Sequence, residues 1–596
     1  MKQFLITVAG VLIGLVLFVI LAPLALIGLA GAAARPAPVP AASVLVLDLR
    51  QGLTDQPSDA PFALLQGRGA SVIGIEQTLR VAGRDPRVRG LLVRLPEGGM
   101  APAAADELRR AFLAFRKTGK PILAHSQGLY ADGTVVSTYE LGAASGDLWM
   151  QPGASFQVTG LARDEVFFKR LFDRFGVVAD YQQRYQYKTA VNPFLYDDYT
   201  PAHRESELSW MGSVFGTSLI AAASDRGRPV DALARAVEAG PYSAEEAKTK
   251  GLIDQVGEVK AAQDAILAKA GPHARFLALS DYAARLARRR GSGSADGPTV
   301  AVISAEGDIV TGSSADSPGG PFSGSQAIRS DDIAKAFYDA IDDRDVKAIV
   351  FRVSSPGGSD TASEQILSAV RAAKAAGKPV VVSMGTYAAS GGYWISSQAS
   401  EIVAEPSTLT GSIGVFGGKF ALGKALGRYG VDMRGLKVGG DFADAFSPEA
   451  PMSPAQHAAV SAWMDHIYQG FVSRVAQGRH LSVARVEDIA KGRVWTGAQA
   501  QKLGLVDRIG DFYDAVDQAK SLAHIGGQAH LRSYNGETTP LEALRRLLGA
   551  EASGARIMAQ VGSVAQDPAA RSALEGLDEV RLRAEGAAVL APRLVN

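Results

Sequence analysis

The sequence predicts an α/β protein built from two tandem copies of one domain. From residue 43 onward, short apolar segments with strand character alternate with amphipathic helical segments. The same order of segments returns after residue 297, and several short sequence words return with it, at an offset of 253 to 259 residues. Ordered matches at a nearly constant offset indicate an internal duplication.

The first segment is expected to be a membrane anchor over residues 1–35. Phe4–Ala34 contains no charged residue, and Phe4–Ala22 alone is long enough to cross a bilayer. A cleaved signal peptide usually has a shorter apolar segment, although the small residues before Arg35 leave cleavage open. Lys2 should stay in the cytoplasm, so the rest of the chain would lie outside the cytoplasmic membrane. Residues 36–42, with three prolines, are expected to be a spacer.

Strands and helices alternate in the same order in the two predicted repeats. In the first, residues 43–287, we expect strands at Ser43–Leu49, Gly90–Leu95 and Pro121–His125, and a helix at Ala104–Phe115. In the second, residues 298–530, we expect strands at Val300–Ser304, Ala348–Val353 and Pro379–Met384, and helices at Asp332–Ile341 and Ala362–Ala376. Residues 288–297 have the composition of an exposed linker. The pattern lapses in a tail over residues 531–596.

Three pairs of sequence words carry the duplication. Each word of the first repeat has a counterpart in the second: Arg87–Arg94 and Asp345–Arg352, Gly119–Pro121 and Gly377–Pro379, Tyr242–Asp254 and Trp495–Asp507. In both repeats, paired glycines follow the first word. If the repeats share a fold, the positions at which they differ should locate the chemistry.

Composition excludes several classes of function. The net charge of +1, from 62 basic and 61 acidic residues, carries no signature of nucleic-acid binding. The absence of cysteine excludes disulfides, thiolate metal sites and a cysteine nucleophile. The eight histidines form no ligand pair of the HExxH kind. We therefore expect neither a metal nor another cofactor.

The heptapeptide Tyr387–Tyr393 suggests a nucleophile. The apolar run Val380–Met384 precedes this small-residue stretch, which we expect to form a turn, and Tyr393–Ser397 is suited to open a helix. Ser390 would then lie where a strand passes into a helix N-terminus, whose unpaired N–H groups and positive dipole stabilise an oxyanion. We hypothesise that Ser390 is a catalytic nucleophile. The alternative is a Ser/Gly turn that packs a helix on a sheet.

The two repeats differ at this serine and at one lysine. The first repeat has Tyr130–Gly133, without serine, in place of Tyr387–Ser390. It has Lys188 within the aromatic segment Tyr185–Pro193, whose counterpart, Val438–Ala443, has no lysine, although Lys437 lies just before it. A serine hydroxyl needs a base, and a buried lysine with a lowered pKa can serve. Each repeat thus offers one member of a Ser/Lys pair. The alternative for the lysine is an exposed position on a strand.

Further residues fit supporting roles. Gly357 and Gly358 follow a predicted strand and can present N–H groups to an oxyanion, with the Gly391 N–H as another donor. Ser412 can hydrogen-bond the lysine amine and orient it. A Ser-His-Asp triad is the competing mechanism, with His457 or His466 and Asp465, but these lie in an ordinary amphipathic helix over 455–472. Phosphate binding by the glycine turn is disfavoured because the GxxxxGK[ST] pattern is absent.

Over about residues 1–530 the chain resembles the long, duplicated form of the signal peptide peptidase A (protease IV) family. The resemblance rests on the anchor, the tandem halves and four motifs: Ser355–Ser359, Tyr387–Tyr393, Leu409–Gly417 and Tyr187–Phe194. It implies a serine endopeptidase of the crotonase-like, Clp-protease-like α/β fold, with Ser390 as nucleophile and Lys188 as general base. It assigns Ser412 to support the lysine and places Gly357, Gly358 and Gly391 at the oxyanion.

The resemblance also implies a cellular setting. It implies a bowl-shaped homotetramer on the periplasmic side of the bacterial inner membrane that degrades cleaved signal peptides. The substrates expected are extended apolar peptides, with no nucleic acid and no cofactor. Two alternatives stay open: acyl transfer from a coenzyme-A thioester on the same fold, and a non-catalytic membrane scaffold that binds peptides.

Overall fold

The computed structural model describes residues 39–56, 70–290, 297–314, 327–535 and 589–590. The predicted anchor over residues 1–35 and residues 291–296 of the predicted linker lie outside these ranges. Within the part of the chain that is described, no helix combines the length and apolar character needed to cross a membrane.

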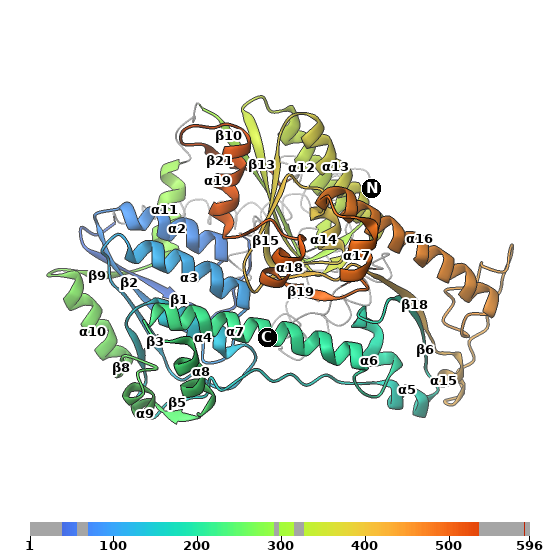
Figure 1. The fold of residues 1–596 in the computed structure, drawn as a ribbon, viewed down its shortest axis with the longest axis horizontal. Helices are drawn as coiled ribbons and strands as arrows, with labels where there is room; N and C mark the ends of the chain where they lie inside the picture. The colour runs from blue at the N-terminus through green and yellow to red at the C-terminus, as the bar shows by residue number, and fades with distance from the viewer. Residues whose placement is uncertain (1–38, 57–69, 291–296, 315–326, 536–588, 591–596) are drawn as a thin grey trace, which may run out of the picture.

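The first repeat contains a six-stranded parallel sheet (Figure 1). The strands stand in the order β8 (Gln255–Val256), β4 (Leu148–Met150), β3 (Ile122–Ser126), β2 (Val88–Arg94), β1 (Ser43–Asp48) and β9 (Arg275–Ala278). Val44, Leu92 and Leu123 pack with α10 (Val259–Ala270) on one face. The opposite face is covered by α2 (Val72–Arg84), α3 (Pro102–Arg116), α4 (Val135–Ala144) and α11 (Leu279–Arg290). Because both faces are covered, the strands are apolar along most of their length.

The second repeat has the same sheet order. Its parallel core reads β20 (Arg508–Ile509), β16 (Glu401–Ala404), β15 (Val380–Ala389), β13 (Val346–Ser355), β10 (Thr299–Glu306) and β21 (His530–Ser533). The helices α12 (Ser330–Asp342) and α13 (Asp360–Ala375) pack with α14 (Gly391–Ser396) on one face, and α19 (Phe512–Leu522) packs on the other. The tandem α/β fold expected from the sequence is confirmed.

The strand before the candidate nucleophile is longer than the sequence suggested. β15 runs to Ala389, and Tyr387–Ala389 pair in parallel with β17 (Leu409–Gly411). The stretch that was expected to be a turn is therefore strand as far as Ala389, and the chain passes into α14 at Ser390 itself. The physical reason is a ladder partner some twenty residues further along the chain, which composition does not reveal.

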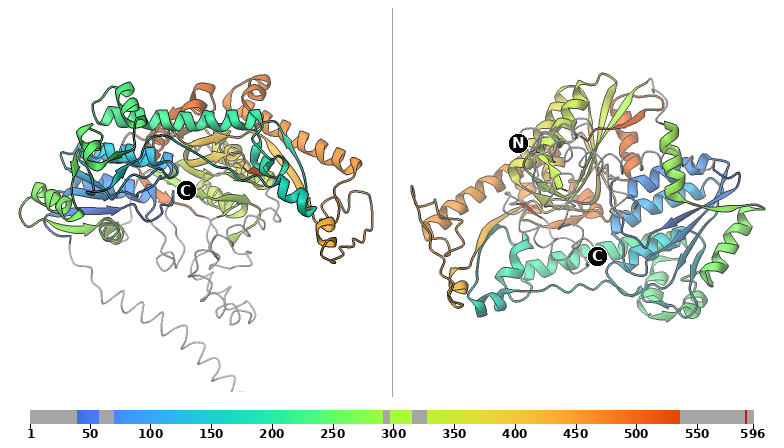
Figure 2. Two further views of the ribbon diagram at one scale, coloured as in Figure 1. Left: turned by 90° about the horizontal axis from the view of Figure 1, so that it is seen from below. Right: turned by 180° about the vertical axis from the view of Figure 1, so that it is seen from behind.

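The two repeats interlock through an arm. β6 (Val178–Arg184) of the first repeat pairs antiparallel with β18 (Val415–Ala421) of the second. This arm projects from one end of the molecule, with α5 (Lys169–Phe175) and α15 (Gly423–Gly427) at its tip (Figures 1 and 2). The long helix α7 (Pro201–Asp225) then runs back along one side of the molecule to the first repeat. The β6–β18 pairing therefore brings chain segments of both repeats together.

The remaining elements are short or peripheral, apart from α16. A small sheet has the order β12-β11-β14-β22, in which β22 pairs antiparallel with β14. The bounds are β5 (Ser155–Phe156), α6 (Asn192–Leu195), α8 (Val230–Glu238), β7 (Tyr242–Ser243), α9 (Ala244–Thr249), β11 (Asp308–Val310), β12 (Ala327–Arg329), β14 (Gly357–Gly358), α16 (Pro454–Arg479), α17 (Val483–Ile489), β19 (Val494–Thr496), α18 (Gly497–Leu503) and β22 (Val589–Leu590).

Candidate active site

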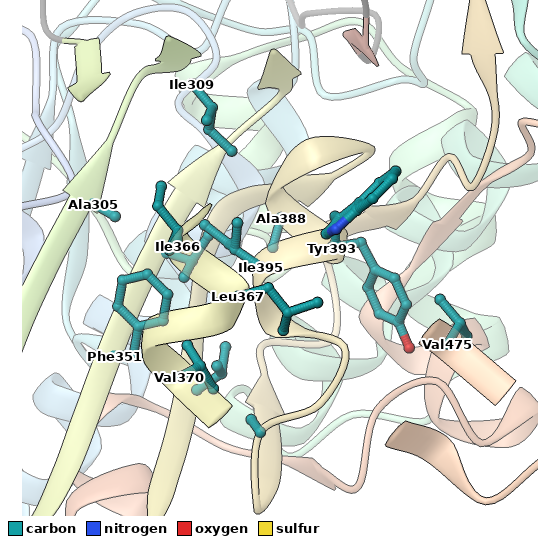
Figure 3. Packing of buried hydrophobic residues seen from close by; sticks show 14 of the residues in the cluster. Ala305, Ile309, Phe351, Ile366, Leu367, Val370, Ala388, Tyr393, Ile395 and Val475 are labelled. Carbon is teal, nitrogen blue, oxygen red and sulfur yellow. The ribbon is translucent and has the colours of Figure 1, made fainter. Parts of the chain in front are cut away.

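Ser390 is held in a conformation that few serines adopt. Its backbone has φ 56° and ψ −117°, outside the regions favoured by residues with a side chain. Its N–H donates to the Gly411 carbonyl at 2.8 Å, so β17 fixes the start of α14. Behind it, Tyr393 and Ile395 pack among side chains of α13 and β13 (Figure 3). The core therefore maintains a strained turn with a serine at its apex.

Lys188 reaches this serine from the other repeat. It lies in the turn after β6 and is buried, with 1% of its surface exposed. Its Nζ lies 2.8 Å from Ser390 Oγ, 3.0 Å from Ser412 Oγ and 3.0 Å from the Ser412 carbonyl oxygen. Burial holds the pKa of the Lys188 amine well below its ordinary value. A neutral amine has two N–H donors and one lone pair, so these contacts suit an amine that donates to Ser412 and accepts the Ser390 hydroxyl proton.

The β6–β18 ladder explains how residues 202 positions apart come together. Its last pair joins Arg184 to Val415. Lys188 lies four residues beyond Arg184, and Ser412 lies three residues before Val415. The two segments leave the same end of the ladder, so antiparallel pairing delivers the lysine and its supporting serine to one point. The contact expected between Ser412 and the lysine is present.

The three predicted oxyanion glycines also converge. A Cβ added to Gly391 would lie 3.0 Å from the Gly358 nitrogen and 3.2 Å from the Gly357 Cα. At Gly358, where φ is 155°, an added Cβ would lie 2.0 Å from the Ile309 carbonyl oxygen. Gly357 N–H donates to Ser355 Oγ at 3.1 Å. Gly358 and Gly391 are therefore the backbone positions best suited to face an oxyanion beside Ser390.

The residues of the competing triad have other partners. His457 contacts Asp180 at 3.0 Å and Gln182 at 2.9 Å, while Asp465 pairs with Arg184. His466 lines a separate cavity of about 440 Å³ beside Trp394. The hydrogen bonds of the described residues include none from either histidine to Ser390.

Two residues beside the site, Glu205 and Arg493, were not singled out by the sequence, and Tyr187 was considered only as part of the aromatic segment around Lys188. Tyr187, Glu205 and Arg493 form a hydrogen-bonded cluster next to Lys188. A signal for one of them was available: at the offset of 253 that matches Trp495 to Tyr242, Arg493 replaces Gly240. Arg493 is thus a difference between the repeats, like Ser390 and Lys188.

Sequence comparison agrees with the duplication and decides the family. The model of Peptidase family S49 matches residues 114–271 and again residues 372–526. The chain belongs to peptidase family S49. It is 34% identical over 527 residues to "Protease 4" of Salmonella typhi, covering 84% of this chain and 82% of that protein. It is 32% identical over 475 residues to "Protease 4" of Haemophilus influenzae, covering 77% and 74%.

The match covers most of both chains, so this S49 protein is a serine-type endopeptidase, as the protease IV resemblance implied. Among solved structures, ClpP1 from Listeria monocytogenes aligns with 36% of this chain and 94% of its own, at 13% identity and a TM-score of 0.23.

Proposed function

We propose that this S49 peptidase cleaves peptides with Ser390 as nucleophile and Lys188 as general base, through an acyl-enzyme. One observation carries the proposal: a buried lysine amine lies 2.8 Å from the hydroxyl of a serine in a strained turn. Hydrogen-bond distance between a base and a nucleophile is the geometric requirement for activation. Burial lowers the pKa of Lys188, which favours the neutral amine that the proposed reaction needs.

In the proposed reaction, the Lys188 amine takes the proton of Ser390 as Oγ attacks the peptide carbonyl carbon. The tetrahedral oxyanion accepts hydrogen bonds from backbone N–H groups of Gly358 and Gly391. The Lys188 ammonium then gives its proton to the leaving amine, and the C–N bond breaks. A water molecule attacks the ester by the reverse sequence, with the same amine as base, and frees the acid product.

The substrate is proposed to bind as an added strand. A described segment of the chain itself, Val589–Leu590, pairs antiparallel with Gly357–Gly358 in β14. This pairing supports the idea that the edge of β14, which holds an oxyanion glycine, accepts an extended backbone. Main-chain bonds at such an edge give affinity without fixing the sequence that is bound.

The cellular setting is proposed from the sequence. An apolar N-terminus would anchor the chain in the inner membrane with its peptidase domains in the periplasm, where cleaved signal peptides are available. Membrane fractionation with protease protection tests the anchor, and cross-linking followed by sizing tests the homotetramer. A chain recovered in the cytoplasmic fraction would contradict the location without touching the chemistry.

The catalytic assignment is tested with Ser390→Ala and Lys188→Ala. Each should reduce peptidase activity by about three orders of magnitude or more, because the two groups act in one step. A serine-reactive acylating inhibitor should label Ser390 in the wild type and react far more slowly in Lys188→Ala. Lys120→Ala is the matched control, since Lys120 is also a lysine with a pKa lowered by burial but donates to the Ala82 and Asp85 carbonyls, away from the β6–β18 ladder.

Normal activity in Lys188→Ala would refute the Ser/Lys pair. Absence of any adduct at Ser390 in folded wild-type protein would instead favour a peptide-binding scaffold.

A further inference from the structure

We propose that Arg493, Glu205 and Tyr187, here called the Arg493 cluster, are positioning residues that hold the Lys188 turn of the first repeat against the second repeat. This inference rests on the proposed role of Lys188. The cluster contacts neither Ser390 nor the oxyanion glycines in its hydrogen bonds, so its effect would pass through the lysine.

The side chains of the cluster join the repeats directly. Glu205, near the start of α7, receives hydrogen bonds on its two carboxylate oxygens from different directions. Arg493 Nη1 donates to Oε1 at 2.7 Å, and the Tyr187 hydroxyl donates to Oε2 at 2.8 Å. The Arg493 guanidinium also lies over the Tyr187 ring, 4.9 Å from its centroid, and over the Trp495 ring at 4.4 Å. Tyr187 immediately precedes Lys188, so a restraint on its ring restrains the lysine backbone.

The main chain around Arg493 holds the other side of the same turn. The Lys491 carbonyl accepts hydrogen bonds from the N–H groups of Tyr185, at 3.3 Å, and Tyr187, at 3.1 Å. Gly492 packs so closely that an added Cβ would lie 2.4 Å from the Lys188 nitrogen. The Arg493 carbonyl accepts from the Ser412 N–H at 2.7 Å. Residues 491–493 therefore contact both the general base and the serine that supports it.

This arrangement has a chemical consequence. The groups that face the Lys188 amine are the Ser390 hydroxyl and the hydroxyl and carbonyl of Ser412, and burial is what lowers the pKa of the amine. The charged groups of the cluster, Glu205 and Arg493, contact the turn through the Tyr187 side chain and are not hydrogen-bond partners of the Lys188 amine. Loosening the turn would admit water, which favours the ammonium and lengthens the contact to Ser390. The cluster would therefore affect the rate and its pH dependence more than the stability of the fold.

The test compares Arg493→Ala, Arg493→Lys and Tyr187→Phe with the wild type. Arg493→Ala should lower kcat by about tenfold or more with KM changed by less than about threefold, because the loss is in geometry rather than in peptide binding. The acid limb of kcat/KM against pH should move to higher pH, since a better hydrated lysine needs a higher pH to become neutral.

The two milder variants should show partial effects. Arg493→Lys keeps the charge but loses the planar guanidinium, so partial activity is expected. Tyr187→Phe keeps the ring under the guanidinium and should give a smaller loss in the same direction.

Arg508→Ala is the matched control. Arg508 forms a comparable ion pair with Glu401, at 3.0 Å, on strands that contact neither the Lys188 turn nor residues 491–493. It should leave kcat and the pH profile unchanged.

The proposal would be overturned if Arg493→Ala had the same kcat as the wild type and the same acid limb of kcat/KM. It would also be overturned if the loss of kcat in all three variants followed a fall in Tm. The labelling rate at Ser390 separates this outcome from failure of the proposed function. If the wild type is labelled normally and Arg493→Ala is labelled at the same rate, only the positioning role fails. If the wild type is not labelled, the Ser/Lys assignment fails first.

Discussion

At the scale of the residue, both members of the proposed Ser/Lys pair are expected to destabilise the fold. Lys188 is buried with hydroxyl and carbonyl partners but no carboxylate among its hydrogen bonds, and Ser390 adopts a positive φ. Burying a lysine without a counter-charge favours its neutral form, and this opposes folding at any pH at which the lysine of the unfolded chain is protonated. The amine that can act as a base at neutral pH is therefore expected to be a destabilising residue.

Lys188→Met should accordingly raise Tm at pH 7 while abolishing activity. Methionine has a similar length and no proton to lose on burial. The pKa of Lys188 is lower in the folded than in the unfolded state, so between the folded pKa and the unfolded value of about 10.5 the unfolded state binds more protons. The wild type should therefore gain stability as pH rises toward 10.5, and the advantage of the variant should shrink over that interval. Thermal unfolding between pH 7 and 10 measures this; a Tm below wild type at pH 7 would contradict the argument.

At the scale of the element, the antiparallel pair β6–β18 is the connection on which the site depends. A Cβ added at Gly418, in the middle of β18, would lie 2.2 Å from the Asp180 carbonyl oxygen, and φ there is 155°. Gly418→Val should therefore disrupt the ladder and move Lys188 away from Ser390. We expect a loss of activity of at least about 100-fold, because displacement of a reacting group by about 1 Å already costs that much.

The control for this variant is Gly427→Ala in α15, where an added Cβ meets nothing within 4 Å. The far-UV circular dichroism spectrum of Gly418→Val should stay close to that of the wild type, because the β6–β18 ladder lies outside both parallel sheets. Full activity in Gly418→Val would mean that the ladder does not set the position of the lysine.

The same ladder marks where prediction from sequence ended. Three strands of each parallel sheet, β1, β2 and β3 and their counterparts β10, β13 and β15, were predicted because each is a local apolar run with a counterpart in the other repeat. β6 was not predicted because Val178–Arg184 is mostly polar and its ladder partner, β18, lies more than two hundred residues away. Ser390 and Lys188 were nevertheless chosen as candidates from the sequence, because each is present in one repeat and missing from the other. Glu205 was missed because a glutamate on a helix carries no pattern until its partners are placed.

At the scale of the whole molecule, the repeats are joined by a buried ionic cluster. Arg352 of β13 is 1% exposed and donates to Asp55 and to Glu107 of α3, both in the first repeat. Burial lowers the pKa of Arg352, but Asp55 and Glu107 outweigh it and raise the pKa well above its ordinary value. Its counterpart in the first repeat, Arg94, instead donates to Gln127 within its own repeat. The duplicated position has thus become an inter-repeat contact in one copy only.

Arg352→Leu should therefore destabilise the protein by about 3–5 kcal/mol, because it leaves two carboxylates buried without their cation. Burial raises the pKa of Glu107, so the variant can relieve the cost by binding a proton at low pH, and the loss measured by urea unfolding should be larger at pH 8 than at pH 5. Adding Asp55→Leu and Glu107→Leu should recover much of the stability, since an apolar cluster needs no compensating charge. Arg508→Leu, which breaks the more exposed Arg508–Glu401 pair, should cost at most about 1 kcal/mol of stability.

The same variant, Arg352→Leu, should lose activity before it unfolds, because Ser390 and Lys188 lie in different repeats. Peptidase activity should therefore fall at a lower urea concentration than the fluorescence signal of either repeat. If activity and fluorescence were lost at the same urea concentration, the repeats would separate only when they unfold.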